Sequence, residues 1–224
     1  MFVELIDALR CPRPHADTWL VAAALETRGR CVVRGTLGCP TCRAEYPVHG
    51  GVARFDQAPG AAADALARAA SPADGADAAP AAAEEAVRLA ALLGLTSPGG
   101  IVAVAGAWDA AVDALVELAE VRVLVVDPAH PYAAREPVGA LTGAWLPVAA
   151  ASLRGVALDA ATAHGDRLAA AVAALRPGAR LVAPASAPVP DGARELARDA
   201  RHWVAERDAP AGAVVPLRRA RPAG

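Results

Sequence analysis

The sequence of 224 residues contains no lysine and no asparagine, and alanine, arginine, glycine and proline dominate it. Such a bias is typical of a GC-rich genome, so the abundance of alanine says little about function. The formal net charge is −2 and the pI is near 6.2, which excludes a strong overall basic field for binding nucleic acid. A secretory signal pattern is missing, as are the roughly 18 uninterrupted apolar residues of a membrane-spanning helix. We therefore expect a cytoplasmic protein that contacts no membrane.

Several catalytic patterns are also missing. The chain has no Asn-Pro-Pro-Tyr-type motif for methylation of amino groups, no cysteine beyond residue 42 and no nucleophile elbow that would organise a serine, histidine and aspartate. The sequence therefore does not indicate a hydrolase or an amino methyltransferase.

All four cysteines lie within residues 9–55, which is the pattern of a small metal-stapled module. Cys11 and His15 form an irregular knuckle, whereas Cys39 and Cys42 form a Cys-x-x-Cys turn whose thiolates can hold one cation. Zinc is the expected metal, because closed tetrahedral sites of three cysteines and one histidine are typical of structural zinc. We predict Cys11, His15, Cys39 and Cys42 as its ligands.

Two alternatives stay open for this region. Cys31 competes with His15 for the fourth position, although it lies among apolar residues, where a free cysteine usually acts as a small hydrophobe. The Cys-x-x-Cys turn could also be an eroded metal site or a redox pair. A redox cysteine is expected at the start of a helix, whereas residues 43–48 are predicted to form a strand. His49 is expected to be a surface turn residue.

Two stretches of this module resemble a known family. Residues 5–12 read Leu-Ile-Asp-Ala-Leu-Arg-Cys-Pro, and residues 39–52 read Cys-Pro-Thr-Cys-Arg-Ala-Glu-Tyr-Pro-Val-His-Gly-Gly-Val. They resemble the small zinc-ribbon family whose eukaryotic member activates tRNA, rRNA and protein methyltransferases, and whose bacterial members are short stand-alone proteins. The family has a second Cys-x-x-Cys where Cys11 and His15 stand here. The resemblance implies a structural zinc ion and a methyltransferase as protein partner.

Composition divides the chain. The segment after the module has almost no large apolar residue and cannot offset its ordering entropy, apart from a short helix expected over 61–70. We predict a zinc-ribbon-like module, an Ala/Pro/Gly linker, a Rossmann-like domain and a tail, over residues 1–56, 57–80, 81–219 and 220–224.

The predicted domain alternates helices with continuous apolar strands, which is typical of a parallel sheet covered on both faces. The predicted helices cover residues 81–95, 109–119, 164–175 and 192–200. The predicted parallel strands cover residues 101–105, 121–126, 141–145, 155–159 and 179–183. A final antiparallel hairpin is expected between residues 202–206 and 214–218. The predicted fold is therefore α/β: a small β module followed by a Rossmann-like, mostly parallel sheet.

Three segments of this domain resemble the class I S-adenosylmethionine-dependent methyltransferase fold. They are Val-Arg-Val-Leu-Val-Val-Asp at 121–127, Trp-Leu-Pro-Val-Ala-Ala-Ala-Ser-Leu-Arg-Gly-Val at 145–156, and Ala-Leu-Arg-Pro-Gly-Ala-Arg-Leu at 174–181, the most specific of the three. The resemblance implies that S-adenosylmethionine would bind the turn after the first strand and an acid after the second. These positions hold Ala105, Gly106, Ala107 and Asp127.

The cofactor turn departs from the family pattern. The family's acidic residue falls on Ala103, and its three glycines fall on Ala105, Ala107 and Asp109, although only glycine lets the backbone close up on the cofactor. Trp108 adds bulk to the turn. Asp109 is expected to cap the next helix with its own carboxylate, which would leave a poorer site for another anion.

The remaining acidic residues have two interpretations each. Asp127 is either a ribose-binding acid or a turn residue before proline. Asp159, at the end of the fourth predicted parallel strand, either faces a substrate cleft or is a helix-entry residue, and the second interpretation is favoured. The family's aspartate near the adenine falls on Ala149 or Ala150. The favoured function is a non-catalytic methyltransferase-like protein with a structural zinc ribbon that binds or scaffolds a partner. An active methyltransferase with an unusual cofactor loop, and a Rossmann-like binder of another nucleotide, are the alternatives.

Overall fold

The structure is a computed structural model that describes residues 1–56, 78–130, 132–143 and 145–209. The short helix predicted over 61–70, the predicted linker up to residue 77, the strand predicted over 214–218 and the predicted tail lie outside these residues.

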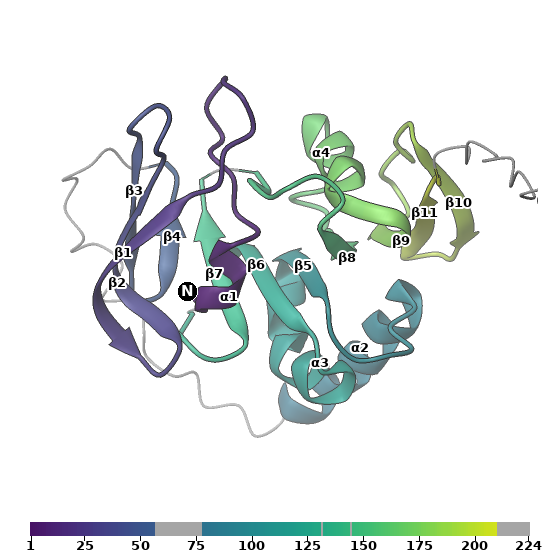
Figure 1. Ribbon diagram of the computed structural model, residues 1–224. Coiled ribbons are helices and arrows are strands. Elements are labelled where there is room, and N and C mark those ends of the chain that lie inside the picture. Colours follow the sequence, from purple (N-terminus) through teal and green to yellow (C-terminus); the bar gives the residue numbers. More distant parts are fainter. Residues whose placement is uncertain (57–77, 131, 144, 210–224) are drawn as a thin grey trace, which may run out of the picture.

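One mixed sheet runs through both parts of the chain (Figure 1), in the order β1-β2-β3-β4-β7-β6-β5-β8-β9-β11-β10. The first part supplies a short helix and an antiparallel meander: α1 (Val3–Ile6), β1 (Val21–Arg28), β2 (Cys31–Gly38), β3 (Glu45–His49) and β4 (Val52–Arg54). Strand β4 then pairs in parallel with β7, so the meander continues into the sheet of the second part.

The second part begins with α2 and alternates strands with helices. Its elements are α2 (Ala78–Leu93), β5 (Ile101–Gly106), the 3₁₀ helix η2 (Ala107–Ala111), α3 (Val112–Ala119), β6 (Arg122–Pro128), β7 (Val138–Thr142), β8 (Leu153–Ala157), α4 (Asp166–Ala174), β9 (Leu175–Pro184), β10 (Ala193–Arg198) and β11 (His202–Arg207). Strands β7, β6, β5, β8 and β9 are parallel, and β11 lies antiparallel between β9 and β10.

Counted within this part, the strand order is 3-2-1-4-5-7-6, a doubly wound order with an antiparallel last strand inserted before the edge. This confirms the predicted Rossmann-like, mostly parallel sheet with a C-terminal antiparallel hairpin. The order reverses between β5 and β8. In open α/β sheets, ligands bind outside the carboxyl ends of the strands at such a switch point.

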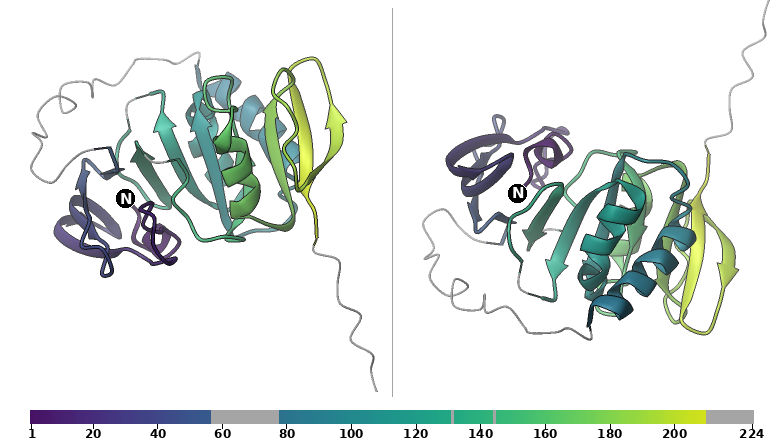
Figure 2. Two further views of the ribbon diagram at one scale, coloured as in Figure 1. Left: turned by 90° about the horizontal axis from the view of Figure 1, so that it is seen from above. Right: turned by 90° about the horizontal axis from the view of Figure 1, so that it is seen from below.

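Helices cover the parallel strands unequally (Figure 2). Helices α2 and α3 lie on one face, where Leu89 and Leu115 share a core cluster with Val102 and Val104 of β5. Helix α4 lies on the opposite face, where Leu168 belongs to a second cluster. Successive buried residues of β5 therefore pack alternately into the cores on the two faces of the sheet, as its continuous apolar run predicts.

The N-terminal part completes that second face. Residues of α1 and of the meander belong to the same core cluster as the parallel strands, and α1 lies against β7 (Figure 1). A Cβ atom at Gly139 of β7 would stand 2.6 Å from Met1 Sδ and 2.8 Å from Leu5 Cδ1. A side chain at this position would therefore force Met1 and Leu5 to shift. The two parts share a sheet and a core, and the division of the chain into a module of residues 1–56 and a domain of residues 81–219 stays a prediction.

The prediction of a helix over residues 192–200 was wrong. These residues form β10, an exposed edge strand that pairs with β11 and has a register shift between Glu195 and Ala197. Alanine, glutamate and arginine favour a helix, but the segment has only one large apolar side chain, Leu196, to bury. Backbone pairing with the free edge of β11 therefore outweighs local propensity.

Residues 202–206 belong to β11, which pairs with β9 on one edge and with β10 on the other. In the described residues the C-terminal hairpin is therefore formed by β10 and β11, whereas the strand expected over residues 214–218 lies outside them.

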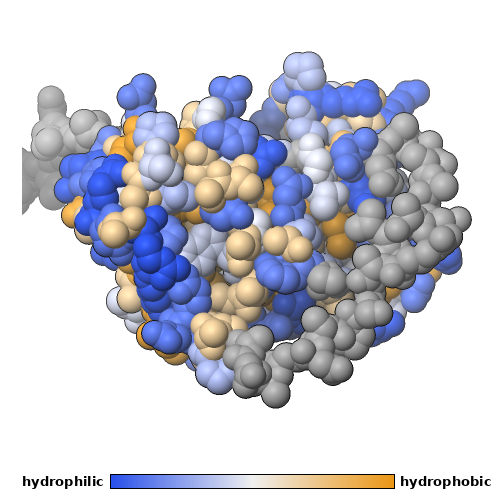
Figure 3. Space-filling model, turned by 180° about the vertical axis from the view of Figure 1, so that it is seen from behind, coloured by the Kyte–Doolittle hydropathy of each residue, from blue (hydrophilic) through white to orange (hydrophobic). Residues whose placement is uncertain are grey.

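No described helix is long and apolar enough to cross a membrane. On the face seen in Figure 3, apolar residues form small areas between hydrophilic ones.

Candidate metal site and cofactor region

The four predicted metal ligands come together at one end of the meander. Cys11 and His15 lie in the loop after α1, whereas Cys39 and Cys42 lie in the turn between β2 and β3. Their ligand atoms all lie within 4.8 Å of one another. The turn is shaped by its backbone: Cys39 N–H donates to the Ala44 carbonyl at 2.8 Å, and Arg43 N–H donates to the Cys39 carbonyl at 2.9 Å.

The distances fit a tetrahedral zinc site. Cys11 Sγ lies 3.7 Å from Cys42 Sγ, and Cys39 Sγ lies 3.5 Å from His15 Nε2. Zinc–sulfur bonds of about 2.3 Å and zinc–nitrogen bonds of about 2.0 Å imply tetrahedral edges of about 3.8 Å between sulfurs and about 3.5 Å between sulfur and nitrogen. These two donor pairs therefore have the spacing of ligands around one ion of this size, and zinc binding itself stays a prediction.

Neighbouring groups orient the donors. His15 Nδ1 lies 2.7 Å from the Ala16 carbonyl oxygen, which can accept its N–H and leave the Nε2 lone pair facing the sulfurs. Tyr46 Oη lies 3.3 Å from Cys11 Sγ. Burial opposes ionisation of Cys11, but hydrogen bonds from Tyr46 and the Arg13 backbone outweigh it and lower the pKa of this thiol. Such outer contacts are what metal sites use to fix ligand geometry.

Cys31 lies outside the group. It is buried in the core at the start of β2, where burial raises the pKa of its thiol. His49, at the end of β3, is also absent from the group of four. The geometry therefore favours His15 over Cys31 as the fourth ligand.

The predicted cofactor turn is occupied by a carboxylate of the chain itself. Gly106 ends β5 with φ of 62°, and Ala107 N–H donates to Asp159 Oδ2 at 3.0 Å. A Cβ atom at Gly106 would collide with that carboxylate. Asp159 Oδ1 accepts from the backbone N–H groups of Ala161 at 3.1 Å and Thr162 at 3.0 Å, and from the Thr162 hydroxyl at 2.7 Å.

Asp127 is engaged as well. It is the second-last residue of β6, with φ of 47°, and its Oδ1 accepts from Gly143 N–H at 3.2 Å. Its Oδ2 lies 3.6 Å from a guanidinium nitrogen of Arg167, whose guanidinium lies 4.8 Å from the centre of the Trp145 ring. The predicted ribose-binding acid therefore faces Arg167 of α4 and the end of β7.

The prediction that Asp109 caps the following helix was wrong. Neither η2 nor α3 has a side-chain cap. The Asp109 carboxylate instead accepts the backbone N–H of His130 at 2.8 Å and lies 2.5 Å from His130 Nδ1. The chain enters α3 through a 3₁₀ turn, so this carboxylate points across to the loop after β6.

Trp108 is buried on the α2/α3 side of the sheet, with 5% of its surface exposed. Its Nε1–H donates to the Leu158 carbonyl at 3.0 Å, and its ring centre lies 5.2 Å from that of His202.

The sequence did not predict three of the partners at the carboxyl end of the sheet, which are Asp159, Arg167 and His130. Their sequence positions give no sign of it, because each acts on a residue more than 20 positions away.

The comparisons with known proteins concern the fold only. No protein-family model and no curated protein matches the sequence. Among solved structures, the chain is similar to geranyl diphosphate C-methyltransferase from Streptomyces coelicolor A3(2), solved with S-adenosyl-L-homocysteine. That match has 17% identity, covers 45% of this chain and 42% of that one, and has a TM-score of 0.37.

Two further solved structures are similar. A candidate sarcosine dimethylglycine methyltransferase from Galdieria sulphuraria has 13% identity, 46% coverage of each chain and a TM-score of 0.37. A candidate S-adenosyl-L-methionine-dependent methyltransferase from Methanococcus maripaludis has 8% identity, coverage of 61% of this chain and 89% of that one, and a TM-score of 0.45. The chain spans less than half the length of the first two structures. Its fold class therefore rests on its own strand order.

Proposed function

We propose that this chain is a non-catalytic methyltransferase-like protein whose N-terminal module holds a structural zinc ion and which binds a protein partner. The observation that carries the proposal is the Asp159 carboxylate on the Ala107 N–H, at the turn where a cofactor would bind. Sheets of this type offer the backbone N–H groups after the first strand to a ligand. Here the Asp159 carboxylate of the chain itself accepts the hydrogen bond from that N–H group.

Displacing Asp159 would be costly. Its two oxygens accept four hydrogen bonds from protein groups, and their loss should cost about 1–3 kcal/mol in total, because two of the four are exposed to water. Asp127, near the end of β6, and Asp109, in η2 after β5, also face protein donors. A cofactor would have to break these contacts before it made its own, which supports a closed, non-catalytic domain.

The four donors of Cys11, His15, Cys39 and Cys42 fit zinc in number, type and spacing. When bound, zinc would have a structural role, because a site with four protein ligands leaves no open position for a substrate. The resemblance of the module to a family of methyltransferase activators supports a methyltransferase as the partner.

The proposal is tested by titrating the purified protein with S-adenosylmethionine and S-adenosylhomocysteine in a calorimeter, with zinc measured on the same sample. We expect about one zinc per chain and no saturable heat with either ligand. Micromolar binding of either ligand would overturn the non-catalytic proposal. A zinc-free, fully folded protein would overturn the structural role of the metal.

A further inference from the structure

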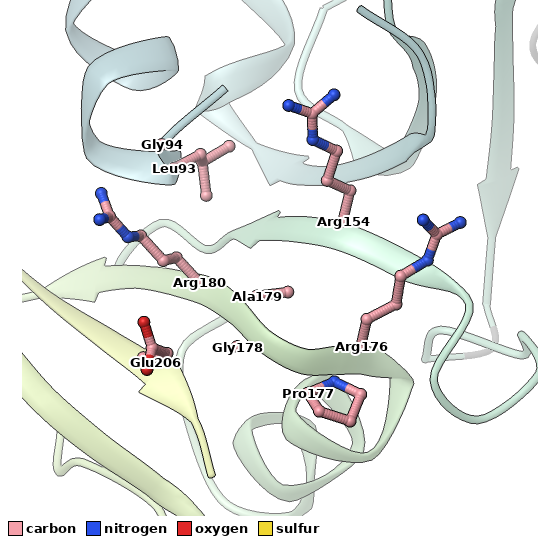
Figure 4. A pocket seen from close by; sticks show the side chains of 9 residues that line it. All are labelled: Leu93, Gly94, Arg154, Arg176, Pro177, Gly178, Ala179, Arg180 and Glu206. Atoms are coloured by element: carbon pink, nitrogen blue, oxygen red, sulfur yellow. The ribbon is translucent and has the colours of Figure 1, made fainter. Parts of the chain in front are cut away.

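Three arginine side chains line one hollow at the amino ends of the parallel strands, opposite the end that holds Gly106 and Asp159 (Figure 4). The hollow has a volume of about 280 Å³ and lies between the end of α2 and the first residues of β8 and β9. Its charged lining consists of Arg154, Arg176, Arg180 and Glu206, a formal excess of two positive charges. The chain as a whole carries a net charge of −2, so this local excess runs against the overall charge.

A break in strand register creates the hollow. Leu153 of β8 is opposite Leu175 of β9, but Gly155 is opposite Arg180, so Arg154 faces four residues of β9. These four residues are Arg176, Pro177, Gly178 and Ala179. They belong to the segment that most resembles the methyltransferase fold, and they bulge around the hollow instead of pairing.

Two of the arginines are held in place by carbonyl groups. Arg154 donates to the carbonyls of Ser97 and Gly99, the latter at 2.7 Å, and to the Ser97 hydroxyl at 3.0 Å. Arg180 donates to the Leu92 carbonyl at 3.3 Å, in the last turn of α2. Their positions are therefore set before any ligand arrives, which lowers the entropy lost on binding.

None of the three arginines in the hollow is paired with a carboxylate of the described residues. In the described part of the chain, Arg154, Arg176 and Arg180 have no acidic oxygen within 4 Å, and the exposed Arg176 has no hydrogen-bonded partner. Glu206 is instead paired with Arg194 at 3.3 Å. Figure 4 shows the three arginine side chains rising on the same side of the strands toward the level of α2.

We propose that this hollow binds a small ligand through a phosphate group. A guanidinium presents a planar set of donors that matches phosphate oxygens, and a phosphate monoester carries a charge of about −2 near neutral pH. That charge equals the formal excess of the lining. The hollow suits a small molecule, and it lies at the amino ends of the parallel strands, away from the turn at Gly106.

The first test is calorimetric titration of the full-length protein with inorganic phosphate at constant ionic strength, with succinate as a dicarboxylate comparison. We expect saturable phosphate binding with a Kd of about 1 mM or below, and succinate binding at least about tenfold weaker. Absence of saturable phosphate binding up to about 10 mM would overturn the proposal. Equal affinity for succinate would overturn the phosphate class.

Variants locate the site. Arg176→Gln removes the one arginine without a structural contact and should weaken phosphate binding about tenfold, because charge-assisted hydrogen bonds are lost. Arg28→Gln is the matched control, since Arg28 is an exposed arginine of the edge strand β1 and does not line the hollow. It should change the affinity less than about twofold. Equal weakening by both substitutions, or by neither, would overturn the site.

A second readout is independent of the variants. Amide chemical shifts in two-dimensional NMR should move on phosphate addition at Arg176, Gly178 and Ala179 and stay constant at Gly106 and Ala107. Shifts confined to other parts of the chain would place phosphate elsewhere and overturn the proposal.

Discussion

The candidate metal site and the carboxyl end of the sheet differ in the partners of their polar side chains. At the metal site, three sulfurs and one imidazole nitrogen point at one another, with a spacing that suits an ion between them. At the carboxyl end, Asp109, Asp127 and Asp159 each point at an N–H group of the chain. Converging donors of one kind need an outside ligand, whereas donors matched to acceptors need none. The first region has the arrangement of an ion-binding site, whereas the second pairs its carboxylates with N–H groups of the chain.

The largest expected effect follows from removing a metal ligand. Cys39→Ser or Cys42→Ser should abolish stoichiometric zinc and unfold residues 9–55, because metal binding at such sites is part of the folding free energy, about 10–16 kcal/mol in zinc-finger peptides. Because Cys39 belongs to the core cluster shared by both parts, cooperative melting of the whole chain should weaken as well. Zinc content and thermal unfolding followed by circular dichroism measure both effects.

Cys31→Ala is the matched control for this prediction. It removes a buried thiol outside the donor group and should leave zinc bound. Loss of zinc from Cys31→Ala, together with its retention in His15→Ala, would contradict the assignment of the fourth ligand.

A smaller effect is expected at the closed end. Asp159→Ala leaves the N–H groups of Ala107, Ala161 and Thr162 without their acceptor and should lower the free energy of unfolding by about 1–3 kcal/mol. Urea unfolding measures the change. Asp191→Ala is the control, because this exposed carboxylate accepts no hydrogen bond among the described residues, and it should stay within about 0.5 kcal/mol of the original protein. If the two variants were equally stable, the Asp159 contacts would not be holding this end closed.

The smallest effect concerns pH. Burial, followed by the charges of Arg88 and Arg201, lowers the pKa of His202, whose ring lies beside Trp108. The folded state therefore favours neutral His202. Stability from this residue is present above the unfolded value of 6.5 and is lost as the pH falls through the lower folded value.

An NMR titration of the His202 ring protons measures this directly, and we expect a midpoint below 6.5. His202→Gln should flatten the stability profile over the same pH window. A midpoint at or above 6.5 would show that the environment of Trp108 does not disfavour the charged ring.

The sequence predicts the larger features of this molecule well. The apolar runs around Val102 and Val123 lie in parallel strands, because continuous apolar strands are stable only when both faces are covered. The Cys39–Cys42 turn and its more distant partners Cys11 and His15 come together as predicted. Each of these signals is local: a run, a spacing or a turn. Such features can be predicted because they depend on residues that are close together in the sequence.

The errors share a different origin. Residues 193–198 favour a helix locally but form β10, since β11 offers a free edge. Asp109 has the local position of a helix cap but contacts His130, because the chain enters α3 through a 3₁₀ turn. In both cases a contact made in the folded protein replaces the one expected from the adjacent sequence.

By itself, the sequence determined the fold class and identified the four residues whose donor atoms come together. Only the tertiary structure decided that Asp159 accepts a hydrogen bond from the N–H of Ala107, because the two residues are separated by 52 positions and the sequence around one gives no sign of the other. It also decided that Arg154, Arg176 and Arg180 share one hollow, which depends on the register between β8 and β9. Periodicity and spacing encode what neighbouring residues do. Contacts between distant strands arise from the packing of the whole sheet.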